Sequence, residues 1–236
     1  LTPSNFTLDK SGNIVLPTRN NQLLIMDTVS FEIIRIVSLP ENLLLGQLTW
    51  LPKRNCFVAG HNWDIVFLDE DFKLIQQIQA EDGAFLPKIH PDERFLAFHS
   101  YDQVEYFNLY RLSDELEITF TETFFKDWEN SSSGFAFNGN EFAVSFPKTL
   151  EYYRLPNNEP EKLWEIDISG YSSKHGLSSL VCIDPNTLIL AKGKVLLFVG
   201  VQQQQIIREE ILDLTSEIRE IYLDSAKKHL FVSTDS

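Results

Sequence analysis

Short apolar runs separated by turn-forming residues follow one another along the whole chain. The pattern is clearest over residues 87–112, where the runs 95–98 and 104–109 follow the turns HPDE and SYDQ. Proline fixes φ and aspartate bonds to its own local backbone, so such clusters between β-rich runs favour hairpins. The stretch therefore predicts three strands joined by two short turns.

This pattern recurs along the sequence. Equivalent second strands are expected to begin near six residues: Asn13, Asn55, Arg94, Glu141, Thr187 and His229. Successive starts lie roughly 40 to 46 residues apart, which is the length of one four-stranded blade. The sequence predicts an all-β fold with five complete four-stranded antiparallel units, at about 6–42, 43–83, 84–124, 125–170 and 171–215, and a partial sixth at 216–236.

Two local details support strands and tight turns within this repeat. Asn20 and Asn21 suit a tight turn with positive φ between two strands. Residues 206–220 have the charge density of a helix, but the β-branched side chains of Ile206, Ile207 and Ile211 permit an edge strand. Long helices are not indicated.

The repeat resembles the WD-repeat-like β-propeller superfamily over nearly the whole chain. The segment HPDERFLAF is similar to that family's first hairpin, and Met26-Asp27 and Leu68-Asp69 stand where the family often has Trp-Asp. The resemblance implies a single β-propeller domain and recognition of a protein. A β-sandwich would give a similar strand spacing, but the grouping in fours favours the propeller.

The partial sixth unit predicts an unpaired strand edge near residues 232–234. A propeller protects its edges by closing the ring. We therefore expect the chain to be part of a longer protein, with the remaining strands of the ring supplied by the same or another chain.

The chain is acidic, with 20 Lys and Arg against 34 Asp and Glu, a net charge of −14. This balance disfavours nucleic acid and anionic membranes as partners, and it is compatible with a basic protein or peptide. No apolar run approaches the length needed for membrane insertion. Cys56 and Cys182 fit small core residues, and such low cysteine use is typical of a cytoplasmic protein.

No motif for catalysis or for a cofactor is recognised in the sequence. G-x-S-x-G, phosphate-loop and dinucleotide patterns are missing, and the histidines form no H-x-x-x-H pair. We expect no catalytic residue, no cofactor and no local metal site. Asp64, Asp102 and Asp127 could converge on a metal from different blades, but turn aspartates are the simpler interpretation.

Loops between the second and third strands of propeller blades emerge on one face, together with the connections between blades. Aromatic residues and arginine most often anchor protein interfaces, so they mark a candidate partner-binding face. The predicted residues are Arg19, His61, Trp63, Tyr101, Asp127, Trp128, Glu129, Tyr171 and His175. Trp63 and Trp128 are the strongest candidates, although each could instead cover the core of its own blade.

The predicted function is a non-enzymatic protein-binding or scaffolding propeller that recognises a protein or peptide through this loop face. One alternative is a propeller enzyme, a metal-dependent lactonase-like hydrolase with a central-channel site. Another is a structural propeller whose outer strands pack against the rest of a parent chain.

Overall fold

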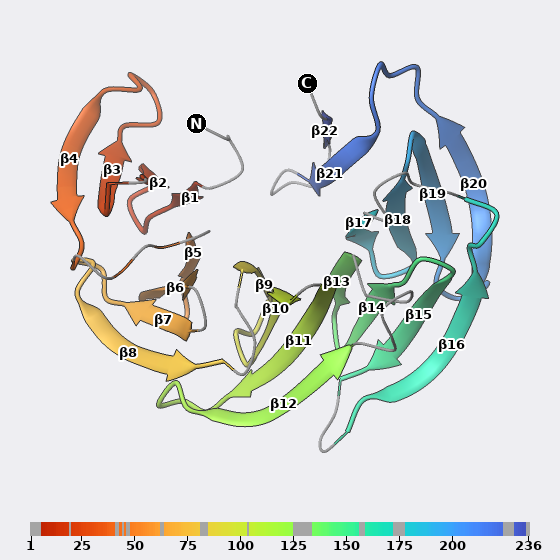
Figure 1. Ribbon diagram of the computed structural model, residues 1–236, viewed down its shortest axis with the longest axis horizontal. Coiled ribbons are helices and arrows are strands. Elements are labelled where there is room, and N and C mark those ends of the chain that lie inside the picture. Colours follow the sequence, from red (N-terminus) through yellow and green to blue (C-terminus); the bar gives the residue numbers. More distant parts are fainter. Residues whose placement is uncertain are drawn as a thin grey trace. The chain divides into compact units, whose positions relative to one another are not determined.

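The computed structural model describes residues 6–18, 20–40, 43, 45, 48–61, 64–80, 85–102, 104–124, 134–155, 159–171, 178–223 and 229–234. This part of the chain is built of β-strands and contains no helix (Figure 1). Consequently, no helix that could cross a membrane occurs among the described residues.

The chain folds into two compact units. Unit 1 comprises Leu1–Gln103 and Asn108–Thr121, and unit 2 comprises Val104–Phe107 and Glu122–Ser236. The third sheet has most of its residues in unit 1, while parts of its last two strands belong to unit 2.

Three four-stranded sheets contribute to unit 1. They are sheet 1, with β1 (Thr7–Leu8), β2 (Ile14–Pro17), β3 (Gln22–Met26) and β4 (Ile33–Ser38); sheet 2, with β5 (Leu48–Leu51), β6 (Cys56–His61), β7 (Asp64–Leu68) and β8 (Leu74–Gln79); and sheet 3, with β9 (Phe85–Ile89), β10 (Phe95–Asp102), β11 (Val104–Leu112) and β12 (Ile118–Phe124).

Two four-stranded sheets and one two-stranded sheet lie in unit 2. They are sheet 4, with β13 (Gly134–Asn138), β14 (Glu141–Ser145), β15 (Thr149–Arg154) and β16 (Glu161–Asp167); sheet 5, with β17 (Ser178–Asp184), β18 (Thr187–Lys192), β19 (Val195–Gly200) and β20 (Gln205–Ile211); and sheet 6, with β21 (Ile218–Leu223) and β22 (Leu230–Thr234).

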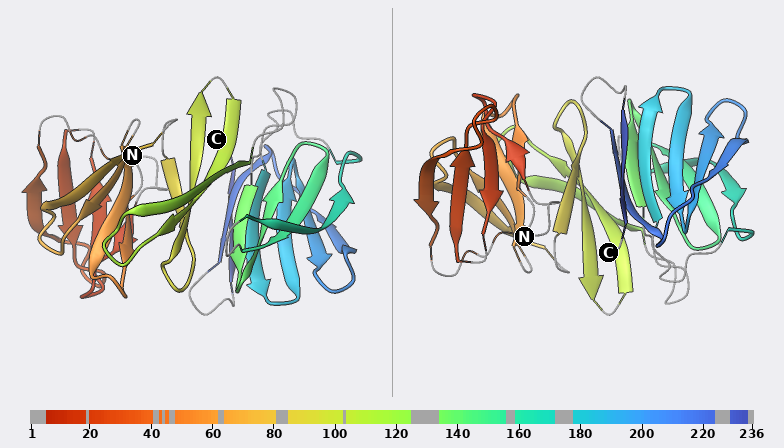
Figure 2. Two further views of the ribbon diagram at one scale, coloured as in Figure 1. Left: turned by 90° about the horizontal axis from the view of Figure 1, so that it is seen from below. Right: turned by 90° about the horizontal axis from the view of Figure 1, so that it is seen from above.

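The strands of each sheet are hydrogen-bonded in chain order, and neighbouring strands such as β1 and β2 or β5 and β6 run antiparallel. In Figure 2 the strands of sheet 1, coloured red to orange-red, run side by side. The prediction of an all-β chain with repeated four-stranded antiparallel sheets is therefore confirmed, and it agrees with a β-propeller-like fold.

Within each unit the sheets pack face to face, with their first strands as neighbours. In unit 1, β1 contacts β5 and β5 contacts β9; in unit 2, β13 contacts β17 and β17 contacts β21. Alternate side chains of a strand point to opposite faces, so each inner strand can contribute to two cores. Val15, Leu23 and Ile25 of sheet 1 meet Phe57 and Leu68 of sheet 2 in one such core.

The fourth strands are largely exposed, and their pairing with the third strand is interrupted at a recurring place. The register skips one residue in β4, β8, β16 and β20, which leaves Ile34, Ile75, Leu163 and Ile207 opposite no partner residue. A β-bulge of this kind bends the strand and increases its twist. The four outer strands therefore curve at equivalent positions.

The turns between third and fourth strands share one geometry in sheets 1 and 2. The carboxylates of Asp27 and Asp69 accept backbone N–H groups two to four residues on. A phenylalanine then adopts positive φ, 57° at Phe31 and 66° at Phe72. Asp27 and Asp69 are thus turn-capping residues at the end of the third strand.

Candidate functional site

The first and third turns of the sheets in unit 1 lie together at one end of the unit. The first turn of sheet 1 contacts the third turn of sheet 2, where Lys10 pairs with Glu70. The first turn of sheet 2 contacts the first and third turns of sheet 3, through bonds from Arg54 to Glu93 and Ser113. In a meander the second strand runs back, so the described ends of β2, β6 and β10 that lead to the second turns lie at the other end of unit 1.

Three of the predicted partner-binding residues lie in described strands or turns. His61 ends β6 and Tyr101 lies near the end of β10, and for both the structure describes the backbone alone. Both belong to the end of unit 1 that carries the second turns. The other six lie outside the described residues: Arg19, Trp63, Asp127, Trp128, Glu129 and His175.

Tyr171, in unit 2, is described in full. Its ring packs against the core between sheets 4 and 5, and its hydroxyl donates a hydrogen bond to Glu209 on β20. This hydrogen bond raises the pKa of the Tyr171 phenol. The side chain therefore covers the core of its own unit while leaving part of its ring exposed.

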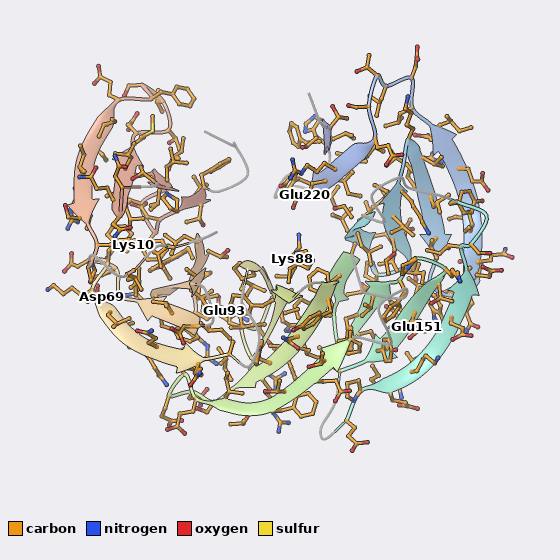
Figure 3. All side chains as sticks on the ribbon, in the orientation of Figure 1. Lys10, Asp69, Lys88, Glu93, Glu151 and Glu220 are labelled. Carbon is orange, nitrogen blue, oxygen red and sulfur yellow. The ribbon has the colours of Figure 1, made fainter. Side chains whose placement is uncertain are left out.

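A network of charged side chains lies at the end of unit 1 that carries the first and third turns. We call it the turn network: Arg54, His90, Asp92, Glu93 and Arg94. Glu93 is almost fully buried and adopts a positive φ of 62°. Its two carboxylate oxygens accept the backbone N–H groups of Lys53 and Arg54, at 3.0 and 3.1 Å. Figure 3 labels Glu93 in its place beside sheet 2.

Arg54 completes the connection between the two sheets. Its Nε donates to the backbone carbonyl of Glu93 at 3.1 Å, and its Nη1 donates to the carbonyl of Ser113 at 2.7 Å. Arg54 of sheet 2 and Glu93 of sheet 3 therefore connect these two sheets. Because these contacts cross roughly 40 to 60 residues of sequence, they hold turns of different repeats together and are not part of any local motif.

His90 and Asp92 form the second half of the turn network. His90 is buried, and its Nδ1 lies 2.5 Å from Oδ1 of Asp92, whose Oδ2 accepts a bond from Arg94 Nε at 2.7 Å. Burial opposes ionisation, but the bonds from Arg94 and His90 outweigh it and lower the pKa of Asp92 to about 2. Asp92 is therefore an ionised hydrogen-bond acceptor, not a proton donor, at neutral pH.

Cys56 lies beside this network at the start of β6. Burial is the main cause that raises the pKa of its thiol to about 11, against a smaller opposing effect of Arg54. A thiol with this pKa is protonated at neutral pH and is a poor nucleophile. The polar groups of this network, of which only His90 and Glu93 are buried, thus serve as hydrogen-bond partners of one another and of the backbone.

Unit 2 contains a pocket of about 390 Å³ at the first turns of sheets 4 and 5. Its lining residues are Asn138, Gly139, Asn140, Glu141, Arg154 and Pro185. Glu141 and Arg154 are opposite each other on β14 and β15, and Arg154 also pairs with Glu161 at 2.6 Å. The lining thus contains one carboxylate and one guanidinium, and the guanidinium is paired with Glu161.

A chain of hydrogen bonds extends from Asn138, one of the residues that line this pocket. Asn138 Nδ2 donates to the Tyr152 hydroxyl at 2.6 Å and to the carbonyl of Pro185 at 3.0 Å, while the Cys182 thiol donates to Asn138 Oδ1 at 3.1 Å. Burial raises the pKa of Tyr152, so its hydroxyl is neutral. Sequence reasoning missed this site, because its residues come from separate turns and only the NGN and DPN triplets hint at it.

Two further buried charges stabilise unit 2. Lys192 donates to the carbonyls of Pro147 and Ile168, and burial lowers the pKa of its ammonium group. Glu151, labelled in Figure 3, accepts the hydroxyl of Tyr153 within sheet 4. Lys192 thus connects β18 to two loop carbonyls, whereas the bond from Tyr153 to Glu151 lies within β15.

The described acidic turn residues do not gather into a metal-binding cluster. Among the described residues, no group of three or more His, Cys, Asp or Glu side chains is arranged to hold a metal ion. Asp64 accepts a bond from Gln77 Nε2 at 2.6 Å, whereas the side chains of Asp102 and Asp127 lie outside the description.

Comparison with known proteins assigns the chain to no family. No protein-family model matches the sequence, and no curated protein shows significant similarity to it.

Proposed function

We propose that this chain is a non-enzymatic, protein-binding scaffold of the β-propeller type. In this proposal the five four-stranded sheets are complete blades and sheet 6 is part of a sixth. The protein recognises a protein or peptide partner through the loops between second and third strands. The resemblance to WD-repeat-like propellers supports this function by analogy.

One observation carries the proposal: the turns of unit 1 are sorted between its two ends. The end with the first and third turns is occupied by Arg54, Glu93 and their bonded neighbours. The ends of β6 and β10 that lead to the second turns carry His61 and Tyr101, and they lie at the opposite end. Loops held on a rigid set of sheets are common recognition surfaces, because the scaffold limits the entropy lost on binding.

The charge of the chain supports a basic partner. A net charge of −14 attracts basic molecules over several ångströms and accelerates their association. Salt screens this attraction, so affinity for such a partner is expected to fall as ionic strength rises.

The test is capture of partners from native extract by the full chain and by a Trp63→Ala/Trp128→Ala variant. A Lys53→Ala/Glu115→Ala variant is the matched control, because both side chains are exposed in turns at the other end of unit 1. We expect a partner that the parent and the control retain and the tryptophan variant loses. Equal capture by all three proteins would refute recognition by the loop face.

The nature of the partner is tested separately. An Asp127→Lys/Glu129→Lys variant reverses two charges of the predicted face. We expect it to lose most of its binding at low salt, whereas unchanged binding would refute the proposal of a basic partner.

A further inference from the structure

Among the described residues, sheet 6 stops at its second strand. Strand β22 is hydrogen-bonded to β21 alone among the described strands, whereas the second strand of each other sheet lies between a first and a third strand (Figure 1). Leu230 and Val232 of β22 face the core shared with sheet 5 and are partly buried. Leu188 and Leu190 of β18 occupy the same place against sheet 4 and are fully buried. Strand β22 thus has the apolar side chains of an inner strand but lies at the edge of its sheet.

The backbone groups of second strands follow a rule in the complete sheets. In sheet 5 the N–H of Val201 donates to the carbonyl of Asn186, which continues the register of β18 and β19. Antiparallel pairing repeats every two residues, so Leu188 and Leu190, which face the preceding sheet, bond to the third strand. In sheets 1 and 4 the equivalent bonds likewise select the residues that point away from the following sheet. The rule predicts that the residues of β22 that face sheet 5 present their N–H and C=O groups to its open side.

The first strand of sheet 6 gives the same direction independently. The N–H of Ile221 donates to the hydroxyl of Ser179 on β17, at 3.1 Å, so it points away from β22. Two residues opposite each other in an antiparallel pair either bond to each other or both direct their backbone groups away. Ile221 is opposite Val232, so the N–H and C=O of Val232 point to the open side, and those of Leu230 do the same two residues earlier. The open edge therefore offers a donor and an acceptor at each of these two residues.

The side chains of β22 do not protect this edge. Edge strands are commonly protected from further pairing by lysine, proline or a bulge. The five residues Leu230–Thr234 include no charge and no proline, whereas the outer strands β4, β8, β16 and β20 each have a bulge. The ring of Phe231 is 56% exposed on the face turned away from sheet 5, where a residue on a neighbouring strand could contact it. The edge thus has the composition of a strand that accepts a neighbour.

The outer strand of sheet 5 suits one added strand and not two. The residue three positions after the bulge packs on the following sheet and is apolar in β4, β8 and β16, where it is Val37, Ile78 and Ile166. In β20 the same position is Glu210, which pairs with Arg208 at 3.2 Å. Both side chains are about half exposed. A fourth strand of sheet 6 would bury this ion pair, and desolvation of two charges is costly.

We propose that the open edge of β22 binds one extended segment of a partner protein, which pairs antiparallel to β22 as the third strand of sheet 6. Addition of a strand to a sheet edge is a general mode of peptide recognition, in which the backbone bonds give affinity. A continuation of the repeat would bring a third and a fourth strand together, as in the five complete sheets, and the ion pair on β20 disfavours the fourth. A single strand from another protein meets both conditions. This recognition goes beyond the loop face proposed above and does not depend on it.

The complete sheets also indicate the chemistry of this segment. Its residues opposite Leu230 and Val232 face the core shared with sheet 5 and are apolar, as Leu197 and Val199 are in the third strand of sheet 5. The residue between them lies opposite Phe231 on the other face, where an aromatic or β-branched side chain packs best. Basic residues on either side of the segment are favoured by the net charge of −14.

The test is binding of a fluorescent peptide to the full chain, measured by fluorescence polarisation. The peptide carries the β19 residues Val195–Gly200 between two lysines at each end, because β19 is the strand that pairs with the second strand of sheet 5. We expect saturable binding in the micromolar range. Hydrogen exchange of the Leu230 and Val232 amides should be fast in the free chain and slower with the peptide bound.

Methylation of backbone nitrogens in the peptide separates strand pairing from apolar adhesion. In β19 the N–H groups of Leu197 and Val199 point to the second strand, and those of Leu196 and Phe198 point to the fourth. A peptide N-methylated at the first pair should bind at least about tenfold more weakly, because two backbone bonds to β22 are lost. The matched control is N-methylation at the second pair, which keeps every side chain and should leave the affinity unchanged.

Variants of the chain locate the binding edge. Val232→Pro removes one N–H from the open side and should abolish peptide binding, whereas Ile207→Pro in the bulge of β20 should not. The methylated peptides keep the test informative if a proline disturbs folding, because they leave the chain unchanged. The Trp63→Ala/Trp128→Ala variant should bind the peptide like the parent, so failure at the loop face and failure at β22 are distinguishable.

Three results would overturn the proposal. They are an absence of binding at millimolar peptide, equal weakening by the two methylated peptides, and Leu230 and Val232 amides that are as protected in the free chain as those of β18.

Discussion

Replacing Glu93 by glutamine tests whether the turn network determines the stability of unit 1. The two oxygens of Glu93 accept backbone N–H groups from Lys53 and Arg54 inside a buried site. Glutamine has the same shape but only one acceptor oxygen, so one N–H then faces an amide NH₂ group. A hydrogen bond to a charged group contributes about 1.5–3 kcal/mol, and an unpaired buried donor costs a similar amount.

We therefore expect Glu93→Gln to lower the free energy of unfolding of unit 1 by about 2–3 kcal/mol. For a unit of this size the melting temperature should fall by roughly 10 °C. Urea denaturation gives the free energy, and hydrogen exchange of the Lys53 and Arg54 amides reports the local contact. Both amides should exchange faster in the variant.

Glu115→Gln provides the control, since it makes the same chemical change on an exposed side chain of the third turn of sheet 3. Its midpoint should remain within error of the parent. If Glu93→Gln behaved like this control in both measurements, the turn network would not be a source of stability, and the reasoning would be refuted.

Three further predictions concern titration and reactivity. The pKa of Asp92 in the folded protein, about 2, is below its unfolded value, so the stability that Asp92 contributes is present above about pH 4 and is lost as the pH falls toward 2. The free energy of unfolding of an Asp92→Asn variant should therefore change less with pH between 4 and 2 than that of the parent. Burial is the main cause that lowers the pKa of His99 to about 4, so protonation favours the unfolded chain and stability should decline from about pH 6.5 down to 4. His99→Phe should remove that decline in urea titrations at successive pH values, and an unchanged slope would contradict the assignment. Cys182, which is partly exposed, should react with iodoacetamide well before Cys56, whose pKa is about 11, and mass spectrometry of the native protein measures the order.

The strands could be predicted from the sequence because their determinants are local. The predicted second strands begin within one residue of those observed, for example at Cys56, Glu141 and Thr187. Apolar runs and turn residues act over a few positions, so one sequence contains enough information. The predicted positive φ at Asn21 is confirmed at 54°, and the charged segment after Ile206 forms strand β20.

The contacts between repeats could not be predicted in this way. Nothing in the spacing of Arg54 and Glu93 indicates that they meet, because the contact depends on how two sheets pack. The pocket at Asn138 and Pro185 has the same origin. The two-residue period of a strand identifies which residues share a face of the sheet. Which residues contact that face depends on how the sheets pack against one another.

Strand β11 has a consequence for the way this chain gains its structure during synthesis. Its first four residues, Val104–Phe107, belong to unit 2, while the rest of the strand belongs to unit 1. Phe107 packs on Phe135, with ring centroids 5.4 Å apart. When β11 leaves the ribosome, Phe135 and the later residues of unit 2 against which Phe107 packs have not yet been synthesised. A fragment that ends before Gly134 would expose that ring to water, so the two units should acquire their final order together and should not be separable by cutting the chain at a single point.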